Sequence, residues 1–207
     1  MESRKNQNET RAKIIAAAGS LFAERGYDAV SIRDIVLKAD VSLGTVNYHF
    51  RNKEGLYRET LTAACESTAL NRSQIAELGQ LPAQTALTIY IREFIKLGGS
   101  PQNWSWEMLL LRREYALPGP FFKEIFGTCS RAELAFLAEQ IGCLAGVEPQ
   151  SPDVEFAAAT LFSQLNMLAL DKNLMSQVIP DLIEYTGTHP DWLTEKLLRQ
   201  LNSIVKA

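Results

Sequence analysis

The side chains best suited to chemistry in this sequence lie between residues 33 and 53, and the chemistry they suit is contact with nucleic acid. Asn47 can pair with the edge of an adenine, and Leu43 can touch a thymine methyl group. Thr45 can do either, and Lys53 would add its charge to free backbone N–H groups at the start of a helix. The predicted DNA contacts are Arg33, Leu43, Gly44, Thr45, Asn47, Tyr48, His49 and Lys53.

Four of these residues have supporting tasks. Tyr48 and His49 are polar aromatic side chains that can reach phosphates. Arg33 can contact a phosphate or a guanine. Gly44 is small where a helix in the major groove must approach DNA closely. Val46 and Phe50, between the predicted contacts, are expected to be core residues.

A catalytic or metal site has little support. Glu107 and Glu114 are one candidate carboxylate pair, but seven residues of helix separate them by about 10 Å, wider than the roughly 5 Å of a retaining glycosidase. The sequence contains no nucleophile elbow, P-loop or zinc-protease motif. Two histidines and three widely spaced cysteines leave little material for a zinc site. We therefore predict no enzyme, cofactor or metal, and a helical enzyme is a minor alternative.

Hydrophobic periodicity predicts that helices position the candidate residues. The first helix has Thr10 as its expected N-cap and Gly26 as its stop. Ser31 begins a second with a capping-box pattern in which Asp34 replaces the usual Glu or Gln. Ser42 can cap a third that runs to about Phe50, and Asn52 can cap a fourth. Two short helices joined by a turn, behind a longer one, make a helix-turn-helix.

The rest of the chain also reads as helical. Glycine and proline clusters separate apolar periodic stretches, and no run shows the alternating, β-branched pattern of strands. The predicted fold class is all-α. The expected later helices lie near residues 83–97, 102–116, 121–144, 152–170, 175–186 and 190–205.

Charge is distributed unevenly along the 207 residues, whose formal net charge is -3. Ten basic and seven acidic residues up to Arg58 make the first segment +3, and the remaining 11 basic and 17 acidic residues make the rest -6. A basic N-terminal segment followed by an acidic remainder favours a nucleic-acid site near the N-terminus. No apolar run approaches the roughly 20 residues that span a bilayer, and the first residues do not form a secretory signal. With an odd set of cysteines, these features predict a reduced, cytoplasmic protein without a membrane partner.

The segment from Thr10 to Tyr57 includes SLFAERGYDAVSIRDIVLKADVSLGTVNYHFRNKEGLY. It closely resembles the DNA-binding domain of TetR-type (tetracycline-repressor-like) transcriptional regulators, over about a quarter of the chain. Four segments match: LFAERGYDAVSIRDI (residues 21–35), which connects the first two helices, and VS (41–42) before the recognition helix. The others are GTVNYHF (44–50) within the recognition helix and NKEGLY (52–57) at the start of the next helix. The family usually has Gly where this chain has Asp40, at a turn that commonly needs a left-handed backbone.

The resemblance implies a function and a division of the chain. In the family, positions that match Thr45, Tyr48, His49 and Lys53 are frequent DNA contacts. Residues 1–58 would form a three-helix DNA-binding domain with a short flexible N-terminal arm, and residues 59–207 a helical effector-binding and dimerisation domain. Such a protein would be a homodimeric repressor that binds a palindromic operator in double-stranded DNA. A small hydrophobic effector would release it; the alternative is a constitutive regulator without an effector.

Aromatic and soft side chains crowd the middle of the chain, as an apolar effector pocket with a few polar anchors would require. The predicted pocket residues are Tyr90, Phe94, Trp104, Trp106, Met108, Arg112, Tyr115 and Phe122.

Two later helices are apolar over much of their surface, and in the family the last long helices form a four-helix dimer bundle. The alternative is that both complete a monomer core. The predicted dimer contacts are Phe156, Leu161, Phe162, Leu165, Trp192, Leu197 and Leu201.

Overall fold

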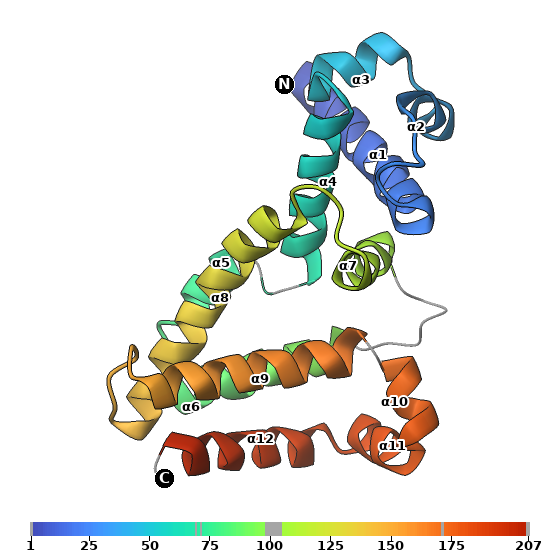
Figure 1. Ribbon diagram of the computed structural model, residues 1–207. Coiled ribbons are helices and arrows are strands. Elements are labelled where there is room, and N and C mark those ends of the chain that lie inside the picture. Colours follow the sequence, from blue (N-terminus) through green and yellow to red (C-terminus); the bar gives the residue numbers. More distant parts are fainter. Residues whose placement is uncertain (1, 69, 71, 98–104, 171, 206–207) are drawn as a thin grey trace. The chain divides into compact units, whose positions relative to one another are not determined.

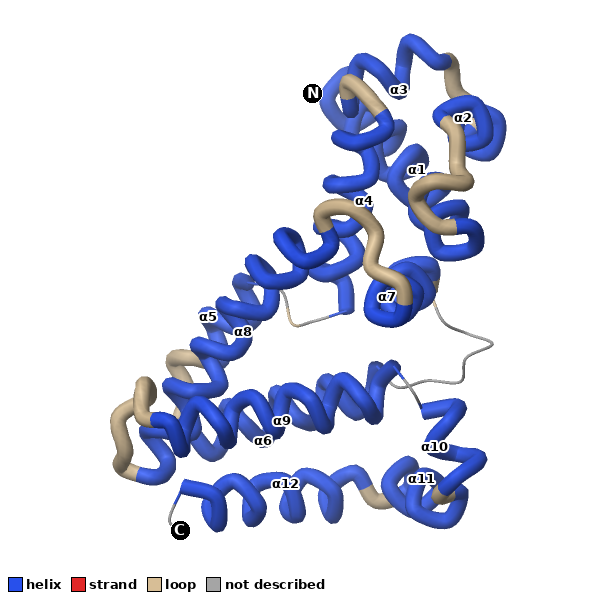
Figure 2. The backbone as a smooth tube through the Cα atoms, viewed as in Figure 1, coloured by secondary structure: helices blue, strands red, loops and turns tan. Residues whose placement is uncertain are grey.

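The computed structural model describes residues 2–68, 70, 72–97, 105–170 and 172–205, and these residues form helices and connecting loops without a strand (Figures 1 and 2). The all-α prediction is therefore confirmed for the described part of the chain. The helices are α1 (Glu2–Arg25), α2 (Ile32–Ala39), α3 (Leu43–Phe50), α4 (Lys53–Thr68), α5 (Arg72–Leu78), α6 (Ala83–Leu97), α7 (Trp106–Ala116), α8 (Phe122–Ala145), α9 (Pro152–Leu170), α10 (Lys172–Val178), α11 (Pro180–Thr188) and α12 (Pro190–Val205).

The helices form two compact units. The first, which we call the N-terminal unit, contains α1–α4, α7 and the first two turns of α8. The second, the C-terminal unit, contains α5, α6, the rest of α8 and α9–α12. Helix α4 runs through residue 58, where the sequence suggested a functional boundary, and α7 joins the first unit from far along the chain.

Helix α1 begins earlier than its sequence suggested. It starts at Glu2, so Thr10 is not its N-cap; the Thr10 hydroxyl instead donates to the Asn6 carbonyl, 2.9 Å away, inside the helix. The segment predicted as a flexible arm is rich in good helix formers and contains neither proline nor glycine, so nothing in it ends the helix. The predicted stop is confirmed, because Gly26 has a φ of +80° and its N–H bonds the Phe22 carbonyl at 2.8 Å.

One core joins α7 to the helix-turn-helix. Leu110 and Leu111 of α7 are buried in the same cluster as Ile14 of α1 and Leu61 of α4. A methyl group added at Gly19 of α1 would overlap the Trp106 ring, so α7 packs directly on the α1 backbone. The N-terminal unit therefore needs α7 to complete its interior.

In the C-terminal unit, α6, α9 and α12 pack against one another. The sequence missed the short helix α5, and it expected one helix over residues 175–186 where α10 and α11 stand. Pro180 separates these two helices, because proline lacks an N–H and suits the first position of the second helix. Residues 102–104, expected at the start of α7, lie outside the described residues. None of the described helices combines the length and apolarity needed to cross a membrane.

Candidate DNA-binding site and effector region

Local hydrogen bonds hold the start of α2. The Ser31 hydroxyl accepts from the Asp34 N–H at 3.2 Å, and the Asp34 carboxylate accepts from the Ser31 N–H at 2.8 Å. The predicted capping box is therefore present, with Asp in place of Glu. The hydrogen bonds from the Ser31 side chain and backbone lower the pKa of the Asp34 carboxyl group.

The turn between α2 and α3 has the left-handed backbone that its position in the sequence suggested. Asp40 has φ 49° and ψ 57°, and its N–H caps the end of α2. Aspartate adopts this conformation at a cost that glycine avoids. The turn therefore forms with a residue less suited to it, and it brings Ser42 to the start of α3.

Helix α3 presents one polar face outward and one apolar face inward. Val46 and Phe50 are buried, as expected. Leu43 and Tyr48 are 51% and 72% exposed, and Asn47 is exposed beside them. We call Leu43, Gly44, Asn47 and Tyr48 the outward face of α3; their spacing places them on one side of a helix. Thr45 and His49 are half-buried at its edges.

Ser42 fixes the first turn of α3. Its hydroxyl accepts from the Thr45 N–H at 3.0 Å and lies 2.8 Å from the Thr45 hydroxyl. Gly44 needs no small side chain for the sake of the fold, because an added Cβ would meet only the Ser42 hydroxyl, at 3.6 Å. The free space over Gly44 is therefore available to a molecule that approaches from outside.

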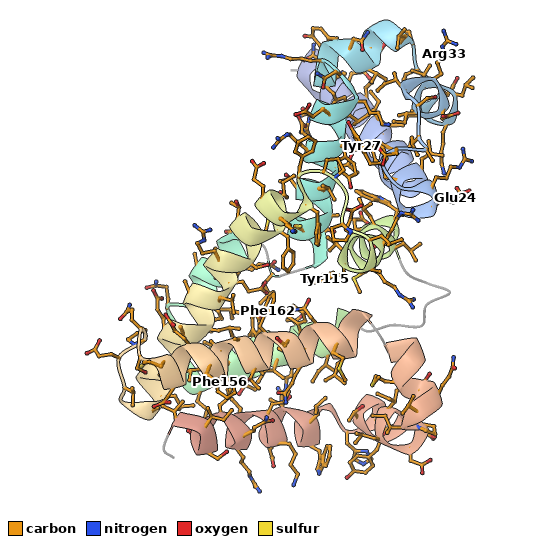
Figure 3. The ribbon with its side chains drawn as sticks, in the orientation of Figure 1. Glu24, Tyr27, Arg33, Tyr115, Phe156 and Phe162 are labelled. Atoms are coloured by element: carbon orange, nitrogen blue, oxygen red, sulfur yellow. The ribbon has the colours of Figure 1, made fainter. Side chains whose placement is uncertain are left out.

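Basic side chains stand near both ends of this region. The Lys53 ammonium lies 4.2 Å from the centre of the Tyr27 ring, where a cation–π contact holds it at the start of α4. Arg33 projects outward from α2 (Figure 3) and forms no ion pair with another described residue. Arg51, which the sequence analysis did not select, is exposed directly after α3 and has a positive φ of 64°.

The structure divides the residues predicted for an effector pocket. Tyr90 and Phe94 lie on α6 in the C-terminal unit, and Trp104 is outside the described residues. The N-terminal unit contains the remaining five, Trp106, Met108, Arg112, Tyr115 and Phe122.

Trp106 packs on Gly19, so its ring is part of the contact between α1 and α7. Tyr115 and Phe122 form an aromatic cluster with Phe126, with ring centres 4.9–5.5 Å apart. Aromatic side chains serve both in cores and in ligand pockets, so these contacts leave the predicted pocket a prediction.

Glu114, a member of the candidate carboxylate pair, stabilises a turn through a hydrogen bond. It is buried, and its carboxylate accepts the Gly119 N–H at 2.7 Å in the turn between α7 and α8. Burial and the neighbouring Glu114 raise the pKa of the Tyr57 hydroxyl. Among the described residues, no group of His, Cys, Asp and Glu side chains could hold a metal ion.

A buried carboxylate that the sequence analysis missed lies in the C-terminal unit. The Tyr90 hydroxyl donates to Glu133 Oε1 at 2.7 Å, and both side chains are buried. Burial raises the pKa of the Glu133 carboxyl group to about 7, against the opposite effect of the hydrogen bond from Tyr90. Glu133 lies three residues before Phe136 and four before Leu137, on the apolar side of α8, and that spacing was the available signal.

The residues predicted for a dimer interface fall into two groups, one at least partly exposed to solvent and one buried within the chain. Phe156 on α9 is 64% exposed, and Phe162 and Trp192 are half-buried. The other four are buried within the single chain: Leu161, Leu165, Leu197 and Leu201. These four therefore contribute to the core in which α6, α9 and α12 meet.

Comparison with known proteins gives a consistent pattern. The family model described as bacterial regulatory proteins, tetR family, matches residues 14–60. The probable HTH-type transcriptional regulator YttP of Bacillus subtilis is 33% identical over 82 residues, covering 33% of this chain and 40% of that protein. The biofilm operon icaADBC negative transcriptional regulator IcaR of Staphylococcus aureus is 27% identical over 104 residues, covering 45% of this chain and 56% of that protein. The chain spans about half the length of the curated relatives it matches.

A solved structure extends the similarity in fold over nearly the whole chain. The transcriptional regulator FadR from Bacillus subtilis, in complex with stearoyl-CoA, matches with a TM-score of 0.62 and 21% identity. The match covers 93% of this chain and 97% of that one. The helices beyond residue 60 therefore share the fold of a known helical regulator.

Proposed function

Because this chain belongs to the TetR family of bacterial regulatory proteins, we propose that it is a homodimeric transcriptional repressor that a small hydrophobic effector releases from DNA. The similarity to IcaR, a negative regulator, supports repression. The structure of FadR in complex with stearoyl-CoA supports a small-molecule ligand. Such a protein acts in the cytoplasm, where bacterial DNA lies, and catalyses no reaction.

The observation that carries DNA binding is the outward face of α3. Val46 and Phe50 hold the helix from inside, so Leu43, Asn47 and Tyr48 are free to meet a major groove. Asn47 reads a base edge and Leu43 a thymine methyl, whereas Tyr48 contacts phosphate. The space over Gly44 allows the close approach.

The neighbouring polar side chains position the helix on the duplex. Lys53 and His49 contact phosphates, and Arg33 contacts a phosphate or a guanine. Thr45 contacts a base while its hydroxyl lies near Ser42. Contacts to phosphates set the register of the helix, and contacts to base edges set the preferred sequence.

A homodimer would supply a second recognition helix. Two copies of α3 would contact half-sites about 34–36 Å apart, one turn of DNA. Because Leu161 and Leu197 are buried within one chain, the surface offered to the partner would be the outer side of α9 and α12, with Phe156, Phe162 and Trp192.

The effector would act by linkage. A ligand that binds better to a dimer with differently spaced recognition helices weakens DNA binding by the difference in its two affinities. Helix α4 is the expected lever, because it begins at Lys53 and packs against α7 within the N-terminal unit.

The test of this function is selection of bound duplexes from a random DNA pool with the purified full chain. We expect a palindromic consensus whose half-sites are one helical turn apart, and a complex that contains two protein chains. Recovery of sequences without symmetry, or no enrichment over the starting pool, would contradict the proposal.

A further inference from the structure

One side of α8 carries polar side chains into the interior of the C-terminal unit. Ser130, Glu133 and Gln140 are each more than nine-tenths buried, and Leu137 between them is fully buried. Because residues three, four and seven apart lie on one side of a helix, these positions form a single row about 15 Å long. We call Ser130, Glu133 and Gln140 the polar row of α8.

The polar row has few partners within the part of the chain that the structure describes. The Tyr90 hydroxyl donates to Glu133 at 2.7 Å, whereas the side chains of Ser130 and Gln140 form no hydrogen bond with a described residue. Buried polar groups in folded proteins nearly always have a partner, since an unpaired one loses its interaction with water. Among the described side chains, only Tyr57 and Glu107 have a fully enclosed polar atom without a hydrogen-bond partner, so solvent still reaches the unpaired polar atoms of Ser130 and Gln140 and leaves them available to a ligand.

Glu133 also lacks a positive partner among the described residues, and burial raises the pKa of its carboxyl group. On α6, Arg92 pairs with Asp191 and Lys96 with Glu93. Among the described residues of this unit, the other charged side chains of α8, α9 and α12 are exposed: Arg131 and Glu139 on α8, Asp153 and Glu155 on α9, and Glu195, Lys196 and Arg199 on α12. A buried carboxylate is costly unless a cation neutralises it.

Aromatic rings adjoin this carboxylate. The Tyr90 ring, whose hydroxyl bonds Glu133, lies 5.2 Å from the Phe94 ring and 5.7 Å from the Phe136 ring, centre to centre. Aromatic faces attract organic cations and also contact their apolar parts.

We propose that the polar row of α8 anchors an effector that is an organic cation, an ammonium group on an apolar or aromatic body. The ammonium would pair with Glu133 and donate to Ser130 and Gln140, and the body would contact the rings of Tyr90, Phe94 and Phe136. The proposal rests on the proposed function in one respect, because it names the chemical class of the effector.

The test uses two molecules of nearly equal shape, 2-phenylethylamine and 2-phenylethanol, and isothermal titration of the full chain at pH 8. The amine carries the positive charge and the alcohol does not. We expect the amine to bind at least about tenfold more tightly than the alcohol, and to raise the melting temperature of the protein.

Variants of α8 locate the site. Glu133→Gln keeps an acceptor for the Tyr90 hydroxyl and removes the charge, so it should weaken binding of the amine at least tenfold. Glu139→Gln removes an exposed carboxylate from the same helix and should bind as the wild type does. If Glu133→Gln does not fold, as judged by circular dichroism, Gln140→Leu takes its place and should also weaken binding.

The pH dependence gives an independent measurement. Protonation of Glu133 competes with the amine, whose own charge is unchanged between pH 6 and 8. With a pKa of about 7, the ionised fraction falls about tenfold from pH 8 to pH 6, so the dissociation constant should rise by about that factor. The Glu133→Gln variant should show no such rise.

Equal binding of the amine and the alcohol, no binding of the amine at millimolar concentration, or wild-type binding by Glu133→Gln would each overturn the proposal. DNA binding by the same preparation separates this result from the proposed function. A protein that binds its selected operator but not the amine contradicts only the ligand class. A protein that binds the amine but no DNA contradicts the proposed function.

Discussion

At the scale of single residues, α3 has two sets of side chains. One set packs in the core, and the other, the outward face of α3, is available to DNA. Val46 and Phe50 are buried and hold the helix, whereas Asn47 and Tyr48 are exposed. Gly44 is informative because the protein around it has room for a larger side chain. Its small size is therefore explained by an external molecule better than by internal packing.

The Gly44→Ala variant should fold normally but bind its operator about tenfold more weakly. An added Cβ meets nothing closer than the Ser42 hydroxyl at 3.6 Å, so thermal unfolding should occur at the wild-type temperature or slightly above it. Fluorescence anisotropy with the selected duplex measures the affinity. Gly127→Ala on α8, where an added Cβ has no neighbour within 4 Å, is the matched control and should bind normally. Unchanged affinity of Gly44→Ala would remove Gly44 from the site.

Lys53 should contribute to DNA binding of any sequence, whereas Asn47 should contribute to the preference for particular base pairs. Lys53→Ala should weaken binding to specific and random duplexes about equally, and lower the slope of log affinity against log salt by about 0.9. Asn47→Ala should relax the preference at particular base pairs and leave that slope nearly unchanged. Titrations of both variants at several salt concentrations, with operator and random DNA, measure the two effects. Identical behaviour of the two variants would refute the assigned roles.

At the scale of elements, the helix caps of the helix-turn-helix are formed by residues close together in the sequence. The packing of α7 against this unit joins segments that are far apart in the sequence. Ser31, Asn52 and Ser42 each bond a backbone N–H three residues later, and all three were predicted from the sequence. Helix α7 reaches the same unit after α5 and α6, through the contact between Trp106 and Gly19. No pattern within α1 or α7 alone indicates that they meet.

The Gly19→Ala variant should destabilise the N-terminal unit by roughly 1–3 kcal/mol, the usual cost of overpacking a core. The new methyl group would overlap the Trp106 ring and force α7 away from α1. Urea unfolding monitored by circular dichroism measures the change. The double variant Gly19→Ala with Trp106→Leu should recover part of the lost stability, since a smaller side chain leaves room for the methyl. A double variant no more stable than Gly19→Ala with intact Trp106 would show that the two residues do not meet.

At the scale of the whole molecule, positive charge is concentrated in the DNA-binding segment, and a buried ionisable group lies in the C-terminal unit. The first 58 residues carry a net charge of +3 and the rest -6, so DNA attracts the segment that contains α3 and repels the acidic remainder. In the C-terminal unit, burial raises the pKa of the Glu133 carboxyl group, so we expect stability to depend on pH.

The free energy of unfolding should fall as pH rises from about 4.5 to about 7, and then level off. The pKa of Glu133 is about 7 in the folded chain and 4.5 as its ordinary value, so the folded state binds the proton more tightly and loses this advantage as the carboxyl ionises. The contribution amounts to up to about 3 kcal/mol. Urea unfolding at pH 5, 6, 7 and 8 measures it. The Glu133→Gln variant should lack this decline, and Glu139→Gln should keep it; a decline of the same size in Glu133→Gln would assign it to another group.

The sequence by itself determined the all-α class and the helix-turn-helix with its caps, whereas the left-handed turn at Asp40 was expected from the resemblance to a family. These features depend on periodicity and on hydrogen bonds between residues close in the chain, so their signals are local. Only the tertiary structure decided that Trp106 packs on Gly19, that Leu161 and Leu197 are buried within one chain, and that Glu133 is enclosed beside Tyr90. Each of these depends on contacts between segments far apart in sequence, where the type of a residue alone does not reveal its partner.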